Sequence, residues 1–295
     1  MSKKKTILVT GATGFIGHHV VNELHNKGHN VIAFSRHQKK AELLSWWGKV
    51  KFVIADMQDP NLNIRELFGE PEILIHLAWA GLPNYHAMFH YEENLPASYH
   101  FIIKMVKSGV KQVLVAGTCL EYGMQYGKLS EETHTEPITS YGIAKDTLRK
   151  FLQIYQQNIS FTLQWVRLFY TYGTGQNPNS LFAQLNSALD HKDDIFNMSG
   201  GEQLRDYLPV EEVAHRIALV AEHPECNGVI NCCSGNPISI RRLVEEYILS
   251  HGSGLNLNLG YFPYQEYEPM AFWGEGKKIH NLLLKNDENF LREKK

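Results

Sequence analysis

The chain has 295 residues and a mass of 33.8 kDa, of which 43% are hydrophobic, 20% charged and 11% aromatic. This composition allows a large buried core and excludes a disordered or fibrous chain. The formal charge of −2 offers no field that would hold a nucleic acid. No apolar run approaches the roughly 20 residues that span a bilayer, and no signal-peptide pattern is present, so we expect a cytoplasmic protein that binds no membrane.

The cysteines lack the paired spacing of a zinc site; they are Cys119, Cys226, Cys232 and Cys233. His86 and His90 lie four residues apart, but no third ligand stands at a useful offset. We therefore predict reduced thiols in or near a core and no metal site.

The first half of the chain alternates between short apolar runs and segments with helical spacing. The runs at 7–9, 31–34, 50–55, 73–78, 113–116 and 162–166 predict strands, and 15–27, 39–47, 95–107 and 140–157 predict helices. This alternation is typical of a parallel sheet covered on both faces. We predict an α/β fold with a Rossmann-type, doubly wound parallel sheet, whose ligands bind where the strands end.

After about residue 168 the alternation loosens. A polar loop covers 171–180, helices are predicted at 181–190, 210–221 and 240–249, and strands at 195–198 and 229–233. Residues 255–273 show no clear period. We predict a Rossmann domain of residues 1–169 and 206–226, and a smaller α/β substrate-binding lobe of residues 170–205 and 227–295. We expect the two to share one continuous core.

A glycine-rich loop joins the first predicted strand to the first predicted helix. Gly11, Gly14 and Gly17 are spaced G-x-x-G-x-x-G, with Thr13, Phe15 and Ile16 among them. A tight turn at the positive end of a helix lets the backbone approach a pyrophosphate, and the third glycine lets the helix pack against the sheet. The loop therefore predicts a dinucleotide site.

The end of the second predicted strand bears on which dinucleotide binds. Sites that select NAD place a carboxylate there to bind the ribose hydroxyl, whereas this chain has Ser35 and Arg36. A guanidinium suits an added 2′-phosphate, so we predict NADP (as NADPH) as the preferred cofactor, with NAD (NADH) possible. Asp56 is placed to accept from the adenine amino group, and Met57 to pack on the ring.

Tyr141 and Lys145 lie four residues apart in a predicted helix and so share one face. A nearby cation lowers the pKa of a phenol from about 10 toward the range that proton transfer requires. Thr118 follows the fifth predicted strand, where its hydroxyl would hold the substrate oxygen that Tyr141 protonates. These three residues are the predicted catalytic group.

Together these residues resemble an extended short-chain dehydrogenase/reductase of the nucleotide-sugar epimerase/dehydratase group. The resemblance covers nearly the whole chain: the glycine loop, Asp56, the strand end His76-Leu77-Ala78, Thr118, Tyr141, Lys145, and the segments 167–173, 203–210 and 228–231. It is specific for the group but much less so for the reaction.

The resemblance implies a hydride shuttle between a nicotinamide ring and a sugar carbon. Tyr141 would be the acid–base group, Lys145 its partner and a ribose ligand, and Thr118 the carbonyl clamp. Leu77 and Ala78 would lie against the cofactor, and Arg205 would bind the nucleotide diphosphate. Further substrate-binding candidates are Glu121, Tyr170 and Asn179. A homodimer through the helices 95–107 and 141–157 is expected.

Departures from the group narrow the reaction. Its 4,6-dehydratases carry an Asp-Glu pair after the clamp hydroxyl, where this chain has Cys119 and Leu120, and its 3,5-epimerase/reductases place a cysteine base at the position of Leu120. The side chain of Cys119 is therefore expected to point elsewhere. Both reactions are disfavoured.

Three activities remain open. The first is NAD(P)H-dependent reduction of the 4-keto group of dTDP-4-keto-6-deoxyglucose or its L-epimer. The product would be of dTDP-fucose or dTDP-6-deoxytalose type, for cell-surface polysaccharide such as lipopolysaccharide. The aromatic tail 261–264 resembles such reductases. The second is a UDP-glucose-type 4-epimerase with tightly bound NAD. The third is a non-catalytic NADP-binding sensor, although such relatives lose the tyrosine or lysine that this chain keeps.

Overall fold

The computed structural model describes residues 3–293, and its centre is a seven-stranded sheet in which all neighbouring strands are parallel. The spatial order is β3 (Lys51–Ile54), β2 (Asn30–Ser35), β1 (Thr6–Thr10), β4 (Ile73–His76), β5 (Gln112–Thr118), β7 (Thr162–Leu168) and β12 (Gly228–Cys232). The order reverses between β1 and β4, which opens a crevice at their carboxyl ends. The prediction of a Rossmann-type, doubly wound sheet is confirmed.

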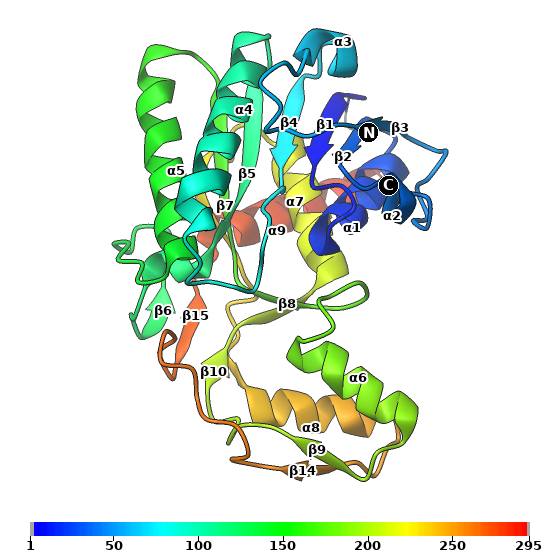
Figure 1. The fold of residues 1–295 in the computed structure, drawn as a ribbon, viewed down its shortest axis with the longest axis vertical. Coiled ribbons are helices and arrows are strands. Elements are labelled where there is room, and N and C mark those ends of the chain that lie inside the picture. The colour runs from blue at the N-terminus through cyan, green and yellow to red at the C-terminus, as the bar shows by residue number, and fades with distance from the viewer. Residues whose placement is uncertain (1–2, 294–295) are drawn as a thin grey trace.

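Helices cover both faces of this sheet (Figure 1). One face carries α1 (Phe15–Asn26), α7 (Val210–Glu222) and α9 (Lys277–Glu293), and the other carries α3 (Ile64–Phe68), α4 (Leu95–Lys107) and α5 (Ser140–Asn158). Successive strand residues point to opposite faces, so Ile7 and Val9 join the first core while Leu8 joins the second. No helix within residues 3–293 is long and apolar enough to cross a membrane.

The second lobe lies below the sheet domain in Figure 1. It contains α6 (Leu181–His191), α8 (Ile240–Ser250) and the parallel pair β9 (Ile195–Asn197) and β14 (Asn256–Asn258). Phe182, Leu185, Val244 and Ile248 form a separate apolar core between its helices. The expectation of one core shared by both lobes is therefore wrong.

Three short strand pairs lie where the lobe joins the sheet domain. They are β8 (Tyr170–Tyr172) with β11 (Tyr207–Pro209), β10 (Leu204–Arg205) with β13 (Ile238–Ser239), and β6 (Gly127–Leu129) with β15 (Phe272–Gly274). A small cluster that includes Cys119, Phe169 and Phe272 fills the space between them. Segments far apart in the chain are thus brought together beside the carboxyl ends of the strands.

The structure corrects two predicted boundaries. The division at residue 227 assigns β12 and α9 to the lobe, whereas β12 pairs with β7 and α9 packs Ile279 into the sheet core. The predicted helix at 39–47 shrinks to α2 (Gln38–Ala41), because the chain turns to bury the Trp46 side chain completely. In both places tertiary packing overrides the local pattern.

Candidate active site

The glycine loop forms a close-fitting cradle at the crevice. Gly11 has a φ of 68°, and a Cβ on it would lie 2.8 Å from the backbone nitrogen of Ala78. A Cβ on Gly17 would overlap the carbonyl oxygen of Gly11. The amino terminus of α1 has no side-chain cap and no acidic residue in its first turn. The loop thus offers backbone N–H groups and a positive helix end to an anion, which fits a dinucleotide pyrophosphate.

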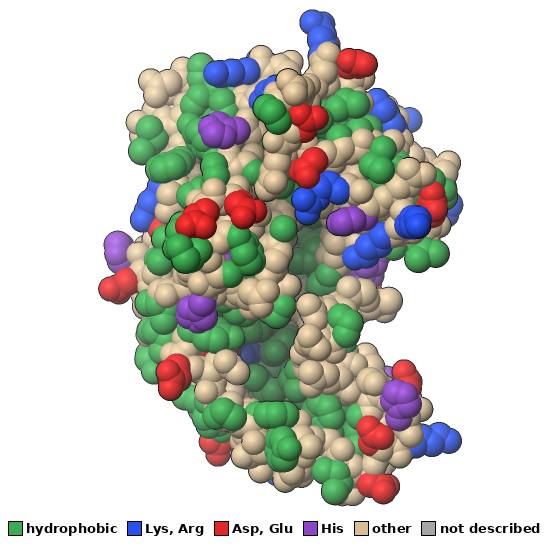
Figure 2. Space-filling view, viewed as in Figure 1, with side chains coloured by type: hydrophobic (Ala, Val, Ile, Leu, Met, Phe, Trp, Pro, Cys, Tyr) green, Lys and Arg blue, Asp and Glu red, His purple; other side chains and the backbone are tan. Residues whose placement is uncertain are grey.

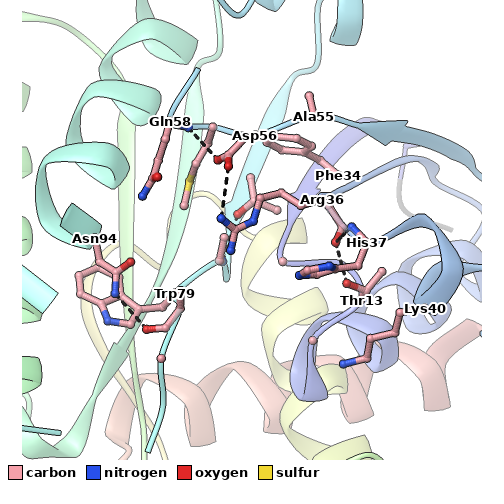
Figure 3. Close-up of a pocket in the computed structure, with 18 residues that line it drawn as sticks. Thr13, Phe34, Arg36, His37, Lys40, Ala55, Asp56, Gln58, Trp79 and Asn94 are labelled. Atoms are coloured by element: carbon pink, nitrogen blue, oxygen red, sulfur yellow. Dashed lines mark hydrogen bonds and ion pairs between the residues drawn. The ribbon is translucent and has the colours of Figure 1, made fainter. Parts of the chain in front are cut away.

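A cavity of about 360 Å³ runs along the crevice from this loop (Figure 3). Of the predicted cofactor residues, Gly11, Thr13, Gly14, Ser35, Arg36, Asp56, Met57 and Ala78 line it. The hydroxyls of Thr13 and Ser35 are 2.7 Å apart, which fixes the loop to the end of β2. Arg36 donates to Asp56 over 3.2 Å, and the backbone N–H of Gln58 donates to the same carboxylate. Asp56 is therefore already engaged by two donors.

Other predicted cofactor residues do not line this cavity, although they support it. Ile16 and Leu77 pack against the apolar core, and Gly17 is buried under the loop. Phe15 begins α1. The backbone N–H groups of Leu77 and Ala78 both donate to the Thr10 hydroxyl, which holds the end of β4 against β1.

Several residues that line the cavity were missed by the sequence reasoning: Thr10, Phe34, His37, Lys40, Trp79 and Asn94. The signal for Trp79 was its position directly after the predicted strand 73–78, since ligands bind at strand ends in such sheets. Its indole N–H donates to Nδ1 of His90, and Asn94 donates to the carbonyl of Ala80. Figure 3 shows Trp79 and Asn94 together at the end of the cavity away from Lys40.

The three predicted catalytic residues lie together at the carboxyl end of β5. Thr118 is the last residue of β5, and its hydroxyl accepts from the N–H of Leu120. Tyr141 lies in the first turn of α5, which Thr139 caps, and Lys145 follows one turn later. The Lys145 ammonium donates to the carbonyl of Ala116 over 2.8 Å. It lies 4.0 Å from the Trp79 ring centroid and 5.9 Å from that of Tyr141.

The pKa of Tyr141 moves in the direction opposite to the expected one. Burial raises the pKa of this phenol, Tyr85 and Glu121 raise it further, and a hydrogen bond with Thr118 acts in the other direction. Burial lowers the pKa of Lys145 to about 7, partly opposed by Glu121. At pH 7 the Lys145 amine carries only part of a charge, so it stabilises the Tyr141 phenolate weakly. The cost of burying a charge therefore outweighs the attraction between the two groups. Tyr141 is thus a neutral phenol at pH 7.

Glu121 is neither solvent-facing nor open to a ligand. Its side chain is fully buried, and its oxygens accept from the backbone N–H of Thr118, the indole of Trp165 and the guanidinium of Arg167. The first of these bonds forms a capping box with the Thr118 hydroxyl. The carboxylate therefore positions Thr118 from behind, because a buried carboxylate needs such partners.

The remaining predicted substrate residues are spread over the lobe junction. Arg205 is buried, donates to Glu268 over 3.0 Å and to the carbonyls of Leu204 and Met270, and stacks on Phe272. The Arg205 guanidinium is not open to a diphosphate while Glu268 occupies it. The pair of Arg205 and Glu268 does not lie on the surface either. Tyr170 is half-buried near Arg205, with the ring centroid 5.6 Å away. Asn179 lies exposed in the loop before α6.

The cysteine beside the clamp lies in the apolar cluster at the lobe junction. Cys119, which was expected to point elsewhere, is buried there with Phe169 and Phe272. Burial raises the pKa of Cys119 itself, so the thiol is neutral. Figure 2 shows the hollow between the sheet domain and the lobe, with hydrophobic side chains on its walls.

Comparisons with known proteins agree with this geometry. A family model described as the NAD dependent epimerase/dehydratase family matches residues 7–233. A protein of Aggregatibacter actinomycetemcomitans named dTDP-6-deoxy-L-talose 4-dehydrogenase (NAD(+)) is 34% identical over 274 residues, covering 91% of this chain and 98% of the relative. The UDP-glucose 4-epimerase of Halalkalibacterium halodurans is 26% identical, covering 94% and 89%. The structure of MoeE5 in complex with UDP-glucuronic acid and NAD has a TM-score of 0.79 at 26% identity, covering 94% and 92%.

Proposed function

The chain belongs to the NAD-dependent epimerase/dehydratase family, and from this premise we propose that it reduces the 4-keto group of a dTDP-linked 6-deoxyhexose. The product we favour is of the 6-deoxy-L-talose type. The observation that carries the proposal is the grouping of Tyr141, Lys145 and Thr118 at the carboxyl end of β5, next to a crevice that fits a dinucleotide. The relative of matching length is named for the same conversion written as an oxidation.

The chemistry divides among a few residues of this chain. A reduced nicotinamide, when bound, supplies the hydride for the sugar carbonyl carbon. Tyr141 donates a proton to the carbonyl oxygen, and the Thr118 hydroxyl, which accepts from Leu120 and hydrogen-bonds with Tyr141, would turn to donate to the same oxygen. Lys145 holds the ribose hydroxyls and stabilises the phenolate that Tyr141 leaves behind. Glu121 keeps the Thr118 hydroxyl in position.

A neutral Tyr141 phenol is the form that the reductive direction uses. Reduction of a ketone needs an acid, and a phenol whose pKa is raised by burial stays protonated at neutral pH. A 4-epimerase, which the 26% identical relative exemplifies by its name, instead begins by taking a proton from the sugar hydroxyl. Such an enzyme also retains its cofactor. Exchange of bound for added cofactor therefore separates the two activities by experiment.

We propose NADPH as the preferred cofactor, with NADH also accepted. The end of β2 and the residues after it line the cavity with Ser35, Arg36, His37 and Lys40. Among the residues that line the cavity, the carboxylate is Asp56, which is paired with Arg36. A 2′-phosphate would offer this guanidinium a stronger, dianionic partner. The comparisons name NAD for the relative and for MoeE5, so the preference must be measured on this chain.

The test is the oxidation of NADPH and of NADH with dTDP-4-keto-6-deoxyglucose or its L-epimer. We expect turnover with both cofactors and a lower KM for NADPH. Arg36→Ala should raise the KM for NADPH by about 10- to 100-fold, the loss of one charge-assisted hydrogen bond or more, and change that for NADH less than about threefold. Lys39→Ala, an exposed neighbour outside the cavity, is the matched control.

Two results would contradict these assignments. Equal losses with NADPH and NADH in the Arg36 variant would overturn the cofactor preference. Interconversion of UDP-glucose without net oxidation of added cofactor, and no reaction with the 4-keto sugar, would identify an epimerase instead.

A further inference from the structure

We propose that Tyr85 is a specificity-determining residue, whose phenol binds the sugar hydroxyl at C3, next to the carbonyl carbon that is reduced. The inference deepens the proposed function and rests on it. Tyr85 lies in the segment 79–91 between β4 and α4, which the sequence reasoning left without a role. Three observations carry the inference: how this segment is held, where the phenol lies, and what the phenol lacks.

The segment is firmly held in place. Gly81 has a φ of 85°, and a Cβ on it would overlap the ring of Phe89. The carbonyl of Asn84 accepts from Nε2 of His90 over 2.9 Å, while Nδ1 of the same ring accepts from Trp79. These bonds give the His90 ring one defined tautomer and close the segment on itself. The backbone of this segment therefore forms a fixed wall of the crevice.

The same segment is bonded directly to the predicted proton donor. The backbone N–H of Tyr141 donates to the carbonyl of Tyr85 over 2.9 Å. The hydroxyl of Ser140 donates to the carbonyl of His86 over 3.0 Å. Both donors lie in the first turn of α5, where N–H groups lack helical partners. The position of Tyr85 is thereby fixed to that of Tyr141.

The two phenols lie side by side. Their ring centroids are 5.8 Å apart with planes 38° from each other, and Tyr85 is the largest electrostatic influence on the pKa of Tyr141. On its other side Tyr85 meets Tyr267 of the lobe, with ring centroids 5.7 Å apart. Tyr85 therefore stands between the catalytic group and the second lobe, in the space that a substrate bridging both would cross.

The Tyr85 hydroxyl is left without a partner. The residue is half-buried, its phenol oxygen is not among the buried polar atoms that lack a partner, and no side-chain hydrogen bond of this oxygen is found within residues 3–293, so the hydroxyl faces solvent. Burial raises the pKa of Tyr85, and Tyr267, Glu268 and Cys119 raise it further, so the group is a neutral donor. A donor that water reaches in the free protein is available to a ligand, because a sugar hydroxyl can take the place of that water.

The chemistry of the proposed substrate identifies that ligand group. In a 4-keto-6-deoxyhexose the carbonyl has a hydroxyl-bearing carbon on one side and a methyl-bearing carbon on the other. Two adjacent phenols can hold adjacent sugar oxygens, Tyr141 the one at C4 and Tyr85 the one at C3. A site built to bind a hydroxyl strongly disfavours an analogue that lacks it, because the protein donor is left unpaired.

The test pairs a variant with a substrate analogue. Tyr85→Phe keeps the ring and removes the hydroxyl, and the 3-deoxy analogue of the 4-keto sugar nucleotide removes its partner. We expect Tyr85→Phe to lower kcat/KM for the full substrate about 10- to 100-fold, and the analogue to lower it equally in the wild type. In the variant, the analogue should cause no further loss.

Controls separate this role from a structural one and from failure of the proposed function. Tyr267→Phe, the other phenol of the ring pair, should keep the wild-type preference for the 3-hydroxyl. Affinity for the cofactor alone and the melting temperature should not change in Tyr85→Phe, while affinity for the product nucleotide sugar, measured by calorimetry, should fall. No turnover of the full substrate by the wild type would reject the proposed function. If the wild type turns over the full substrate, two results would overturn the role of Tyr85. One is an unchanged kcat/KM in Tyr85→Phe, and the other is an equal loss of kcat/KM with the 3-deoxy analogue in both enzymes.

Discussion

At the scale of single residues, the arrangement of Tyr141 and Lys145 has a consequence for catalysis that spacing alone could not reveal. Tyr-x-x-x-Lys predicted an acidified phenol, but both side chains are almost fully buried, and desolvation penalises both charged forms. The phenol is therefore kept protonated and the amine partly neutral. A protonated Tyr141 suits a donor that releases its proton only when negative charge develops on the substrate oxygen.

The burial of Lys145 predicts a stability that depends on pH. The amine has a pKa of 10.5 in the unfolded chain and about 7 in the fold. Between these two pH values the unfolded chain binds one proton more than the folded chain. The free energy of unfolding therefore rises with pH across this window. The full destabilisation by the buried amine is reached below pH 7. We expect Lys145→Met to be more stable than the wild type at pH 6.5, by up to about 5 kcal/mol.

Urea unfolding of both proteins from pH 6.5 to 10 measures this difference. The advantage of Lys145→Met should shrink as the pH approaches 10. Lys107→Met, at an exposed lysine of α4, should show no such trend. A difference that stays constant with pH, or a variant less stable at pH 6.5, would contradict the burial cost.

At the scale of elements, α5 has two faces with different tasks. Tyr141 and Lys145 face the crevice, whereas Ile143, Phe151 and Ile154 are 44%, 47% and 59% exposed on another side. Apolar side chains at this helical spacing form a stripe that a second copy would cover. Tyr99 of α4 packs edge-on against Phe151 and extends the stripe. We propose that α4 and α5 form the interface of a homodimer.

This interface can be tested by placing a charge in it. Phe151→Glu together with Ile154→Glu should convert a dimer into a monomer of 33.8 kDa, because like charges that lack partners are costly to bury. Sedimentation equilibrium at micromolar concentration gives the mass directly. Leu249→Lys, at an exposed leucine of α8 outside the stripe, should leave the dimer intact. A monomeric wild type would contradict the proposal.

The elements also show what the sequence could and could not predict. Strand runs such as 7–9 and the glycine loop carry strong local signals, because period, turn and helix start coincide there. The helix predicted at 39–47 was too long, and α2 has only four residues, since burial of Trp46 depends on contacts distant in sequence. Tyr85 was missed for the same reason: its role arises from a backbone bond to Tyr141, 56 residues later.

At the scale of the whole molecule, two bodies meet around the predicted chemistry. The sheet domain supplies the dinucleotide crevice and the proposed proton donor, and the lobe supplies Tyr267 and the Arg205–Glu268 pair. The sequence predicted the larger body because its βα alternation is regular. It predicted the lobe poorly, since short strand pairs such as β6 with β15 join segments more than 140 residues apart. We therefore expect the lobe to determine the substrate, which the family resemblance leaves open.

The most direct measurement of the central claim follows one hydrogen. Reduced cofactor carrying deuterium at the transferred position of its nicotinamide is supplied with the dTDP-linked 4-keto-6-deoxyhexose, and the product is examined by NMR. We predict one deuterium at C4 of the sugar for each cofactor oxidised in the wild type, and none with Tyr141→Phe under the same conditions. A sugar product free of deuterium, or one formed without consumption of added cofactor, would contradict the account.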